Sequence, residues 1–276
     1  MSRAEFAVAM CVYGGDSPDR FRAAVDSVLT QTCPPTEVVL VVDGPVPEDL
    51  DREIRACEDD PLFRTVRLAV NSGHGIARAA SIAHTRCELV ALMDADDISA
   101  PCRFEKQLAA FADDGEADIV GGMIDEFVTV PTEPIAVREV PLTDAEIKRE
   151  LRRRCPMNQV TVMFKKSAVT DVGGYLDWYS NEDYYLWIRM ALAEKRFANV
   201  PDVLVHVRVG EEMYRRRGGW RYFRSEAKLQ GYMLRRRVIS LPIYLCNVGK
   251  RAIVQVLLPN RVRGWVFQKF ARRSVK

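Results

Sequence analysis

Four apolar stretches, each followed by a polar turn and a segment with helical spacing, constrain the fold of this chain more than any other feature. The first, Phe6–Tyr13, is a continuous apolar run typical of a strand buried on both faces. The other three are residues 37–42, 65–69 and 88–93. Strands that alternate with amphipathic helices in this rhythm predict an α/β fold with a doubly wound, mostly parallel sheet. In such a sheet, ligands bind at the carboxyl ends of the strands.

The fourth strand runs directly into three carboxylates, in the segment ALMDADDISAP. Asp94, Asp96 and Asp97 repel one another and are costly to desolvate, unless a cation or a polyhydroxyl ligand compensates them. Such oxygen ligands suit Mg²⁺ or Mn²⁺, which often share their coordination shell with a substrate diphosphate. A solvated acidic turn is the alternative. Ser99 as N-cap and Pro101 in the first turn predict that a helix begins at once.

Polar residues also fall near neighbouring strand ends. Asp43 could accept a hydrogen bond from a base imide or a ribose hydroxyl, and Arg78 could reach a diphosphate. A turn-forming Asp-Gly and a solvated helix face are the respective alternatives. There is no GxGxxG after the first strand and no Gly-Lys-Ser/Thr loop, which disfavours a dinucleotide-binding fold and a P-loop.

The second half of the chain contains further strand and helix signals. A capping box between Thr143 and Glu146 predicts the start of a helix that runs to Arg154. Another helix is expected to open at Asn181-Glu182-Asp183, where the helix dipole should keep Asp183 ionised, as a catalytic base requires. Strand-like segments cover residues 119–122, 123–130 and 160–164.

Charge is distributed unevenly along the chain. From Glu211 to the end there are 17 Lys and Arg residues against three Asp and Glu, whereas the first 210 residues carry 23 against 35. Basic clusters such as Arg215–Arg217 and Arg235–Arg237 are interleaved with aromatic residues, which predicts helices that bind an anionic membrane surface. Helices that pack on the rest of the protein, with solvated Arg faces, are one alternative. Nucleic-acid binding is the other.

Cysteine usage indicates the compartment. The seven cysteines show no CxxC spacing, which is typical of reduced thiols in a cytoplasmic protein, and the three histidines form no zinc signature. The chain opens directly on a strand, so no signal peptide is expected. No uncharged apolar run approaches the roughly 20 residues of a membrane span.

Several motifs occur in the order seen in one enzyme family: AVAMCVY, SVLTQT, VVLVVDGP, NSGHGIARAASIAHT, ELVALMDADDISAPCRFEKQ, GGYLDW and NEDYYLWIRMA. On these, the chain resembles glycosyltransferase family 2 with the GT-A fold, across roughly residues 5–210. CPMNQVTVMFKKSAV and VRVGEEMYRRRGGWRYFRSEAKL are further similar to bacterial exopolysaccharide and O-antigen assembly enzymes of the amylovoran type. The resemblance implies a Rossmann-like GT-A catalytic domain over residues 1–210. Its nucleotide-sugar half would be residues 1–117 and its acceptor half 118–210, followed by a basic helical tail over 211–276.

The resemblance also assigns roles on the donor side. Tyr13 and Asp43 would lie against the base of a nucleoside-diphosphate sugar, most often UDP, and Arg78 would approach its nucleotide or diphosphate. Asp94 and Asp96 would form the DxD pair. Asp94 would lie nearer the ribose and sugar, and Asp96 would bind Mn²⁺ or Mg²⁺.

On the acceptor side, the resemblance implies that Asp183 is the base of an inverting reaction, with Asn158, Glu182 and Arg208 nearby. His206 shares a strand face with Arg208, where it either approaches the metal or forms structural hydrogen bonds.

The expected function is therefore inverting, metal-dependent transfer of a hexose to a lipid-linked saccharide, on the inner face of the cell membrane. The partners would be a UDP-sugar, that acceptor and an anionic membrane surface, with no nucleic acid. Three alternatives remain open. They are a sugar-nucleotide pyrophosphorylase, a nucleic-acid-binding protein that uses the basic tail, and a catalytically silent sugar-binding scaffold. The donor sugar and the linkage are also open.

Overall fold

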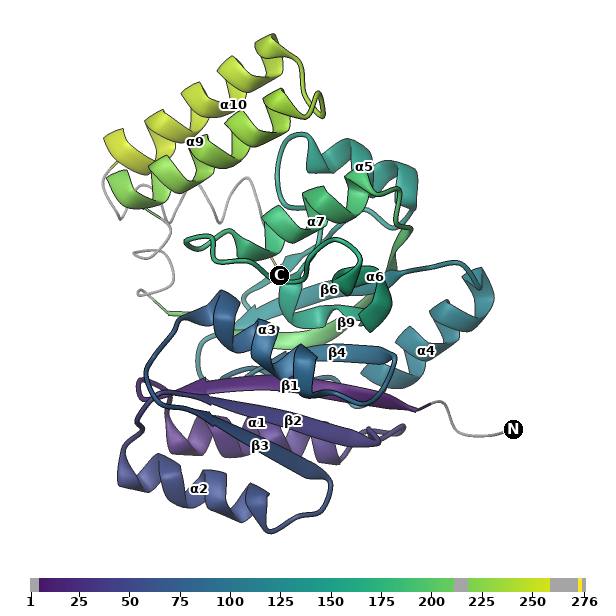
Figure 1. Ribbon diagram of the computed structural model, residues 1–276, viewed down its shortest axis with the longest axis vertical. Coiled ribbons are helices and arrows are strands. Elements are labelled where there is room, and N and C mark those ends of the chain that lie inside the picture. Colours follow the sequence, from purple (N-terminus) through teal and green to yellow (C-terminus); the bar gives the residue numbers. More distant parts are fainter. Residues whose placement is uncertain (1–4, 211–217, 259–272, 275–276) are drawn as a thin grey trace.

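The computed structural model describes residues 5–210, 218–258 and 273–274, which form a central sheet with helices on both faces (Figure 1). The strands are β1 (Phe6–Tyr13), β2 (Glu37–Asp43), β3 (Phe63–Leu68), β4 (Leu89–Asp94), β5 (Ile98–Ser99), β6 (Ile119–Phe127), β7 (Ala136–Arg138), β8 (Met163–Lys165), β9 (Phe197–Arg208) and β10 (Arg273–Ser274). The α-helices are α1 (Pro18–Leu29), α2 (Glu48–Glu58), α3 (His74–His84), α4 (Arg103–Asp114), α5 (Asp144–Leu151), α6 (Lys166–Thr170), α7 (Glu182–Leu192), α9 (Trp220–Arg235) and α10 (Leu241–Ala252). A 3₁₀ turn, η1 (Gln159–Thr161), and a π-helical turn, η2 (Ile253–Leu257), complete the described elements.

Strand β1 lies inside a parallel ladder with β2 on one side and β4 on the other, and β3 extends the ladder beyond β2. Beyond β4, the sheet continues with β8, β6 and β7, and each of these strands is antiparallel to the one before it. The long strand β9 runs parallel to β6 and then pairs with the short strand β5. The carboxyl ends of β1, β2 and β4 therefore meet at one edge, as the sequence predicts.

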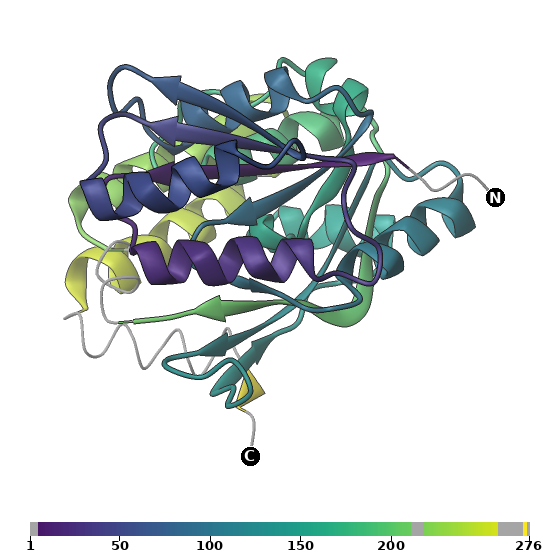
Figure 2. The same cartoon turned by 90° about the horizontal axis from the view of Figure 1, so that it is seen from below.

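Two buried apolar clusters lie on the two faces of this sheet. One face is covered by α1, α2 and α4, which bury residues such as Phe21, Leu50 and Phe104 (Figure 2). On the other face, α3, α5 and α7 bury Ile82, Ile147 and Trp187. Apolar residues on one stripe of each helix explain why each helix packs there.

The hairpin of α9 and α10 packs on the second of these faces, over α7 (Figure 1). Leu229 and Met233 of α9 are fully buried in the same cluster as Trp187, and Asn247 of α10 donates to the carbonyl of Arg152 at 2.9 Å. The described helices of the basic segment thus pack on the rest of the protein, which agrees with one of the alternatives. Arg235–Arg237 are exposed, and the predicted basic cluster 215–217 lies outside the described residues.

Four local expectations are wrong. The helix predicted to run to Arg154 ends at Leu151. The helix after the acidic turn begins at Arg103, because Ile98 and Ser99 pair with β9 and the backbone stays extended. The predicted strand 160–164 begins only at Met163, since η1 precedes it. The two predicted strands between 119 and 130 are one continuous strand, β6. The capping box at Thr143 is confirmed, with both of its hydrogen bonds present.

Within the described residues, none of the helices combines the length and the apolar composition needed to cross a bilayer.

Candidate functional site

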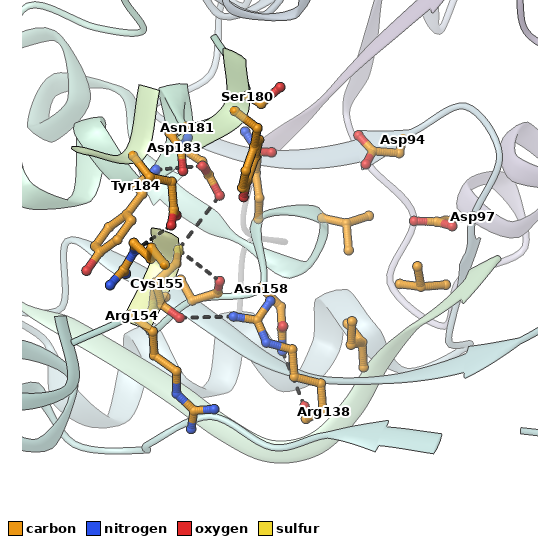
Figure 3. A pocket seen from close by; sticks show the side chains of 18 residues that line it. Asp94, Asp97, Arg138, Arg154, Cys155, Asn158, Ser180, Asn181, Asp183 and Tyr184 are labelled. Atoms are coloured by element: carbon orange, nitrogen blue, oxygen red, sulfur yellow. Dashed lines mark hydrogen bonds and ion pairs between the residues drawn. The ribbon is translucent and has the colours of Figure 1, made fainter. Parts of the chain in front are cut away.

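Two adjoining cavities open at the carboxyl ends of the parallel strands. The larger cavity has a volume of about 630 Å³ and includes Tyr13, Asp43, Asp96 and the turn 71–75 in its lining. The smaller cavity, of about 310 Å³, includes Arg138, Asn158 and Asp183 (Figure 3). Both are lined by Asp94, Asp97, Ser180 and Val207. The acidic turn therefore lies on the boundary between the cavities.

Asp43 ends β2 and fixes a loop of the larger cavity. Its two carboxylate oxygens accept hydrogen bonds from the backbone N–H groups of Ser72 and Gly73, at 2.7 and 2.9 Å. Gly44 has a φ of +85°, and a Cβ there would lie 2.5 Å from the nitrogen of Asn71. The turn therefore packs tightly against the loop before α3. Asp43 therefore does more than form a turn with Gly44. Its carboxylate holds in place the loop 71–75, which lines the cavity.

Arg78 is buried beside the acidic turn, which rules out the alternative of a solvated helix face. Its Nη2 donates to Oδ1 of Asp94 at 2.5 Å, and 1% of its surface is exposed. Burial opposes the charge on Asp94, yet the nearby Arg78, with His74, holds the pKa of Asp94 below its usual value. Arg78 does not itself line the larger cavity, but its partner Asp94 does, and its approach to a diphosphate stays a prediction.

Asp97 is buried at 3% exposure and accepts a hydrogen bond from the backbone N–H of Arg208 at 2.8 Å. Burial, followed by the charges of Asp96 and Asp94, raises the pKa of Asp97 well above its usual value. Burial also raises the pKa of Asp16 to about 6, with smaller contributions from the same two carboxylates. This turn therefore carries negative charge that the surrounding protein only partly compensates.

That excess of carboxylates is the environment in which a divalent cation binds favourably. Among residues 5–210, 218–258 and 273–274, however, no three His, Cys, Asp or Glu side chains converge on a common point. The donor set thus fits an ion held by one or two carboxylates, with a substrate diphosphate and water completing its shell.

Tyr13 ends β1 and is 42% exposed at the wall of the larger cavity. Its backbone N–H donates to the carboxylate of Asp16 at 3.0 Å. The turn after β1 is therefore closed by a side chain that lines the same cavity. Glu182, buried at the start of α7, faces the larger cavity rather than the smaller one. Burial opposes its charge, but its contact with His74, at 3.6 Å, lowers the pKa of Glu182 overall.

Asp183 lies in the smaller cavity, at the first turn of α7. Its Oδ1 accepts from the N–H of Tyr184 at 2.6 Å, and its Oδ2 is 3.7 Å from Sγ of Cys155 (Figure 3). Burial and the adjacent Glu182 raise the pKa of Asp183 to about 6. The sequence predicts that the helix dipole keeps Asp183 ionised, and burial opposes that ionisation. A carboxylate with this pKa is still ionised at neutral pH.

Asn158 is buried in the wall of the smaller cavity, where its Nδ2 donates to the carbonyl of Gly122 at 2.8 Å. Arg208 instead lines the larger cavity. Its Nε donates to the carbonyl of Asp96 at 3.3 Å, and its guanidinium lies 4.6 Å from the centre of the Phe127 ring. Each of these residues thus supports a cavity wall.

His206 forms structural hydrogen bonds, the second of the two alternatives. Its Nδ1 lies 2.8 and 2.9 Å from the two carboxylate oxygens of Asp125, on the neighbouring strand β6. Neither residue lines either cavity.

Sequence reasoning missed four residues of the site. Arg138 and Cys155 line the smaller cavity, Asp16 lines the larger one, and Arg221 reaches the larger cavity from α9. Arg138 belongs to no recognisable sequence motif. The pairing of β7 with β6 brings it to the site. Arg221 lies in the segment that the sequence assigns to a tail, and its guanidinium stacks 4.0 Å from the centre of the Tyr179 ring.

Comparison with known proteins gives a consistent result. Residues 7–173 match the family model described as Glycosyl transferase family 2. The UDP-Gal:alpha-D-GlcNAc-diphosphoundecaprenol beta-1,3-galactosyltransferase of Escherichia coli is 32% identical over 269 residues, covering 98% of this chain and 97% of that protein. The amylovoran biosynthesis glycosyltransferase AmsE of Erwinia amylovora is 34% identical over 224 residues, covering 81% and 84%.

Solved structures confirm the GT-A fold. The structure of S. aureus TarS 1-349 in complex with UDP-GlcNAc has a TM-score of 0.67 at 17% identity, covering 96% of this chain and 76% of that one. The mannosyltransferase PcManGT from Pyrobaculum calidifontis, in complex with GDP-Man and Mn²⁺, has a TM-score of 0.63 at 16% identity, covering 97% and 81%.

Proposed function

Since the chain belongs to glycosyltransferase family 2, we propose that it is an inverting, metal-dependent hexosyltransferase of bacterial exopolysaccharide or O-antigen synthesis. Its donor would be a UDP-sugar and its acceptor a lipid-linked saccharide. One observation carries the proposal. Asp183, a buried carboxylate that is ionised at neutral pH, lines a cavity that shares Asp94 and Asp97 with the larger cavity. Two substrates bound in these cavities would meet at that boundary.

The larger cavity suits the nucleotide part of the donor. Tyr13 offers an exposed ring for a base, and Asp43 keeps the Ser72–Gly73 loop in place beside it. The printed names of two similar proteins support uridine: the E. coli relative uses UDP-Gal, and the S. aureus structure holds UDP-GlcNAc. In this proposal, Asp43 acts through the loop that it holds.

Asp96 and Asp94 would hold the divalent cation, Mn²⁺ or Mg²⁺. When bound, the ion would supply positive charge against the departing diphosphate. The partly compensated carboxylates of the turn support this assignment, as does the Mn²⁺ in the similar Pyrobaculum structure. The Arg78 guanidinium keeps Asp94 ionised and oriented from below.

Asp183 would act as the catalytic base. A hydroxyl of the acceptor in the smaller cavity would give its proton to a carboxylate oxygen of Asp183 as that hydroxyl oxygen attacks the anomeric carbon. Attack from the side opposite the diphosphate inverts that carbon, so an α-linked donor gives a β-glycoside. The β-1,3 linkage in the name of the E. coli relative agrees with this outcome.

The α9–α10 hairpin would bring the enzyme to the membrane that carries its acceptor. One side of α10 and η2 exposes Leu241, Leu245, Ile253 and Val256, and basic residues flank it. An exposed apolar stripe with surrounding cations is typical of interfacial membrane binding. The chain would then be a peripheral protein on the cytoplasmic face of the cell membrane. The proposed functional division remains residues 1–117 for the donor, 118–210 for the acceptor and 211–276 for the membrane.

The deciding experiment is a calorimetric titration of UDP into the wild type and Asp96→Ala, each with and without Mn²⁺. The proposal expects binding that requires Mn²⁺ in the wild type and is lost in the variant. Asp202→Ala is a matched control, because that carboxylate is exposed, pairs with Lys106 and lines neither cavity. Absence of UDP binding to the wild type would refute the donor assignment. Equal binding by the wild type and Asp96→Ala would refute the metal assignment.

A further inference from the structure

We propose that Arg138 and Arg154, at the end of the smaller cavity away from the acidic turn, bind the diphosphate of the acceptor. This inference rests on the proposed function and specifies how the acceptor is recognised. It assigns a second anion site, distinct from the diphosphate of the donor.

Arg138 is the residue that points into the cavity. It ends β7, is half-buried, and donates from Nη2 to the carbonyl of Cys155 at 2.9 Å. Figure 3 shows its guanidinium beside Cys155 and Asn158, on the opposite side of the cavity from Asp94 and Asp97. Its positive charge is close enough to act on Asp183, whose pKa it lowers against the larger effect of burial.

Arg154 stands at the mouth of the same cavity. Its Nε pairs with Glu150, and its side chain is 51% exposed. The wall beside it comes from the hairpin, where Arg251 pairs with Glu226 and donates to the carbonyl of Arg153 at 2.9 Å. The hairpin is thus anchored next to the arginines.

Charge is separated along the smaller cavity. At one end, Asp94 is compensated by Arg78, and Asp97 accepts a hydrogen bond from the Arg208 N–H. On the other side of the cavity are Arg138, Arg154 and Asp183 (Figure 3). A saccharide with its hydroxyl at Asp183 would therefore direct an anionic group on the far side of its ring toward Arg138.

A diphosphate is the anion that fits best. Guanidinium groups present planar pairs of donors that match phosphate oxygens, so two arginines can bind two phosphates. A diphosphate on the anomeric carbon would also direct its lipid toward the hairpin, whose outer side exposes the apolar residues of α10. The acceptor would then run from Asp183, past the arginines, to the membrane.

The test is direct binding of a prenyl diphosphate, which carries the anion and the lipid without a sugar. Geranyl diphosphate is titrated into the protein with UDP and Mn²⁺ at saturating concentration, so that the donor diphosphate site is filled. We expect the wild type to bind it, and geraniol not to bind. Arg138→Gln and Arg154→Gln should each weaken binding about 10-fold or more, since a hydrogen bond to a charged group is lost.

Two controls separate charge from structure. Arg153→Gln removes an exposed neighbouring arginine whose described contact is made by its backbone carbonyl, and it should bind like the wild type. Arg138→Lys keeps the charge and should recover part of the loss in Arg138→Gln. No binding to the UDP-loaded wild type, or equal binding by the glutamine variants, would overturn the inference while leaving the UDP-sugar function intact. Failure of UDP itself to bind would instead refute the proposed function.

Discussion

The guanidinium of Arg78 and the carboxylate of Asp94 form a buried ion pair with a 2.5 Å contact, which joins α3 to the end of β4. The arginine side chain is 1% exposed and that of the aspartate 29%, so buried Arg78 supports Asp94, which lines the larger cavity. A buried pair of this kind is costly to break, because the remaining charge stays desolvated without its partner.

Replacing Arg78 by Met should therefore lower the free energy of unfolding by about 3–5 kcal/mol. The measurement is urea denaturation at neutral pH. Adding Asp94→Asn to Arg78→Met should recover part of the loss, because the orphaned charge is removed, and the double-mutant cycle gives the coupling. A loss below about 1 kcal/mol in Arg78→Met would mean that the pair contributes no more than a surface ion pair does.

The pH dependence of turnover should follow the ionisation of Asp183. The group must be deprotonated to accept a proton, and burial raises its pKa to about 6. At saturating donor and acceptor, turnover should rise with pH and level off above about 7, with an acidic limb near 6. A limb near the ordinary carboxyl value of about 4 would contradict this burial effect.

The same group should make the enzyme less stable as it becomes active. Because the folded pKa of Asp183 lies above its ordinary value of 3.8, its stabilising contribution is present below about pH 4 and is lost as pH rises through 6. Asp183→Asn removes the ionisation and should raise the free energy of unfolding at pH 8 by on the order of 2 kcal/mol. The increase should be smaller at pH 4.5, because only part of the difference in protonation between the folded and unfolded states has accumulated below that pH. Turnover should fall by at least ~10².

Urea denaturation at both pH values checks the stability, and donor transfer at pH 8 checks the turnover. Asp113→Asn is a control, because that aspartate is exposed and lines neither cavity. Near-wild-type turnover in folded Asp183→Asn would show that Asp183 is not the catalytic base.

Local signals were sufficient to predict much of the fold. Strands β1, β2 and β4 are predicted from their apolar composition alone, because they are buried on both faces of the sheet. Their parallel pairing follows from the helices between them. The capping box at Thr143 is equally local. Where long-range pairing competes, the local signal fails. Ser99 is a good N-cap by type, yet its backbone is drawn into a strand with Val205, more than a hundred positions away.

The candidate site divides in the same way. Asp43, Asp94, Asp96 and Asp183 are predicted because carboxylates after strands and at a helix start are visible in sequence. Arg138 is not, since only the β6–β7 pairing carries it to the smaller cavity. The pKa of Asp183 also could not be predicted, because desolvation depends on Cys155 and other neighbours that are distant along the chain.

The exposed side of α10 allows a test of the membrane assignment. Leu245 and Ile253 are 60% and 53% exposed, so replacing both by Ser should leave the fold unchanged. In the proposed mode these side chains enter the lipid, where each buried CH₂ contributes ~0.8 kcal/mol. The double variant should therefore bind phosphatidylglycerol vesicles at least ~10-fold more weakly in a flotation assay.

Val70→Ser is the matched control, because Val70 is 65% exposed but lies on the loop after β3. Raising the salt concentration should weaken vesicle binding of the wild type as well, since Arg235–Arg237 and Lys250 are exposed and their attraction to anionic lipid is screened. The two effects should be separable, because salt screens the charges and the serines remove apolar area. Vesicle binding that is unchanged in the double variant would show that these side chains of α10 and η2 do not contact the lipid.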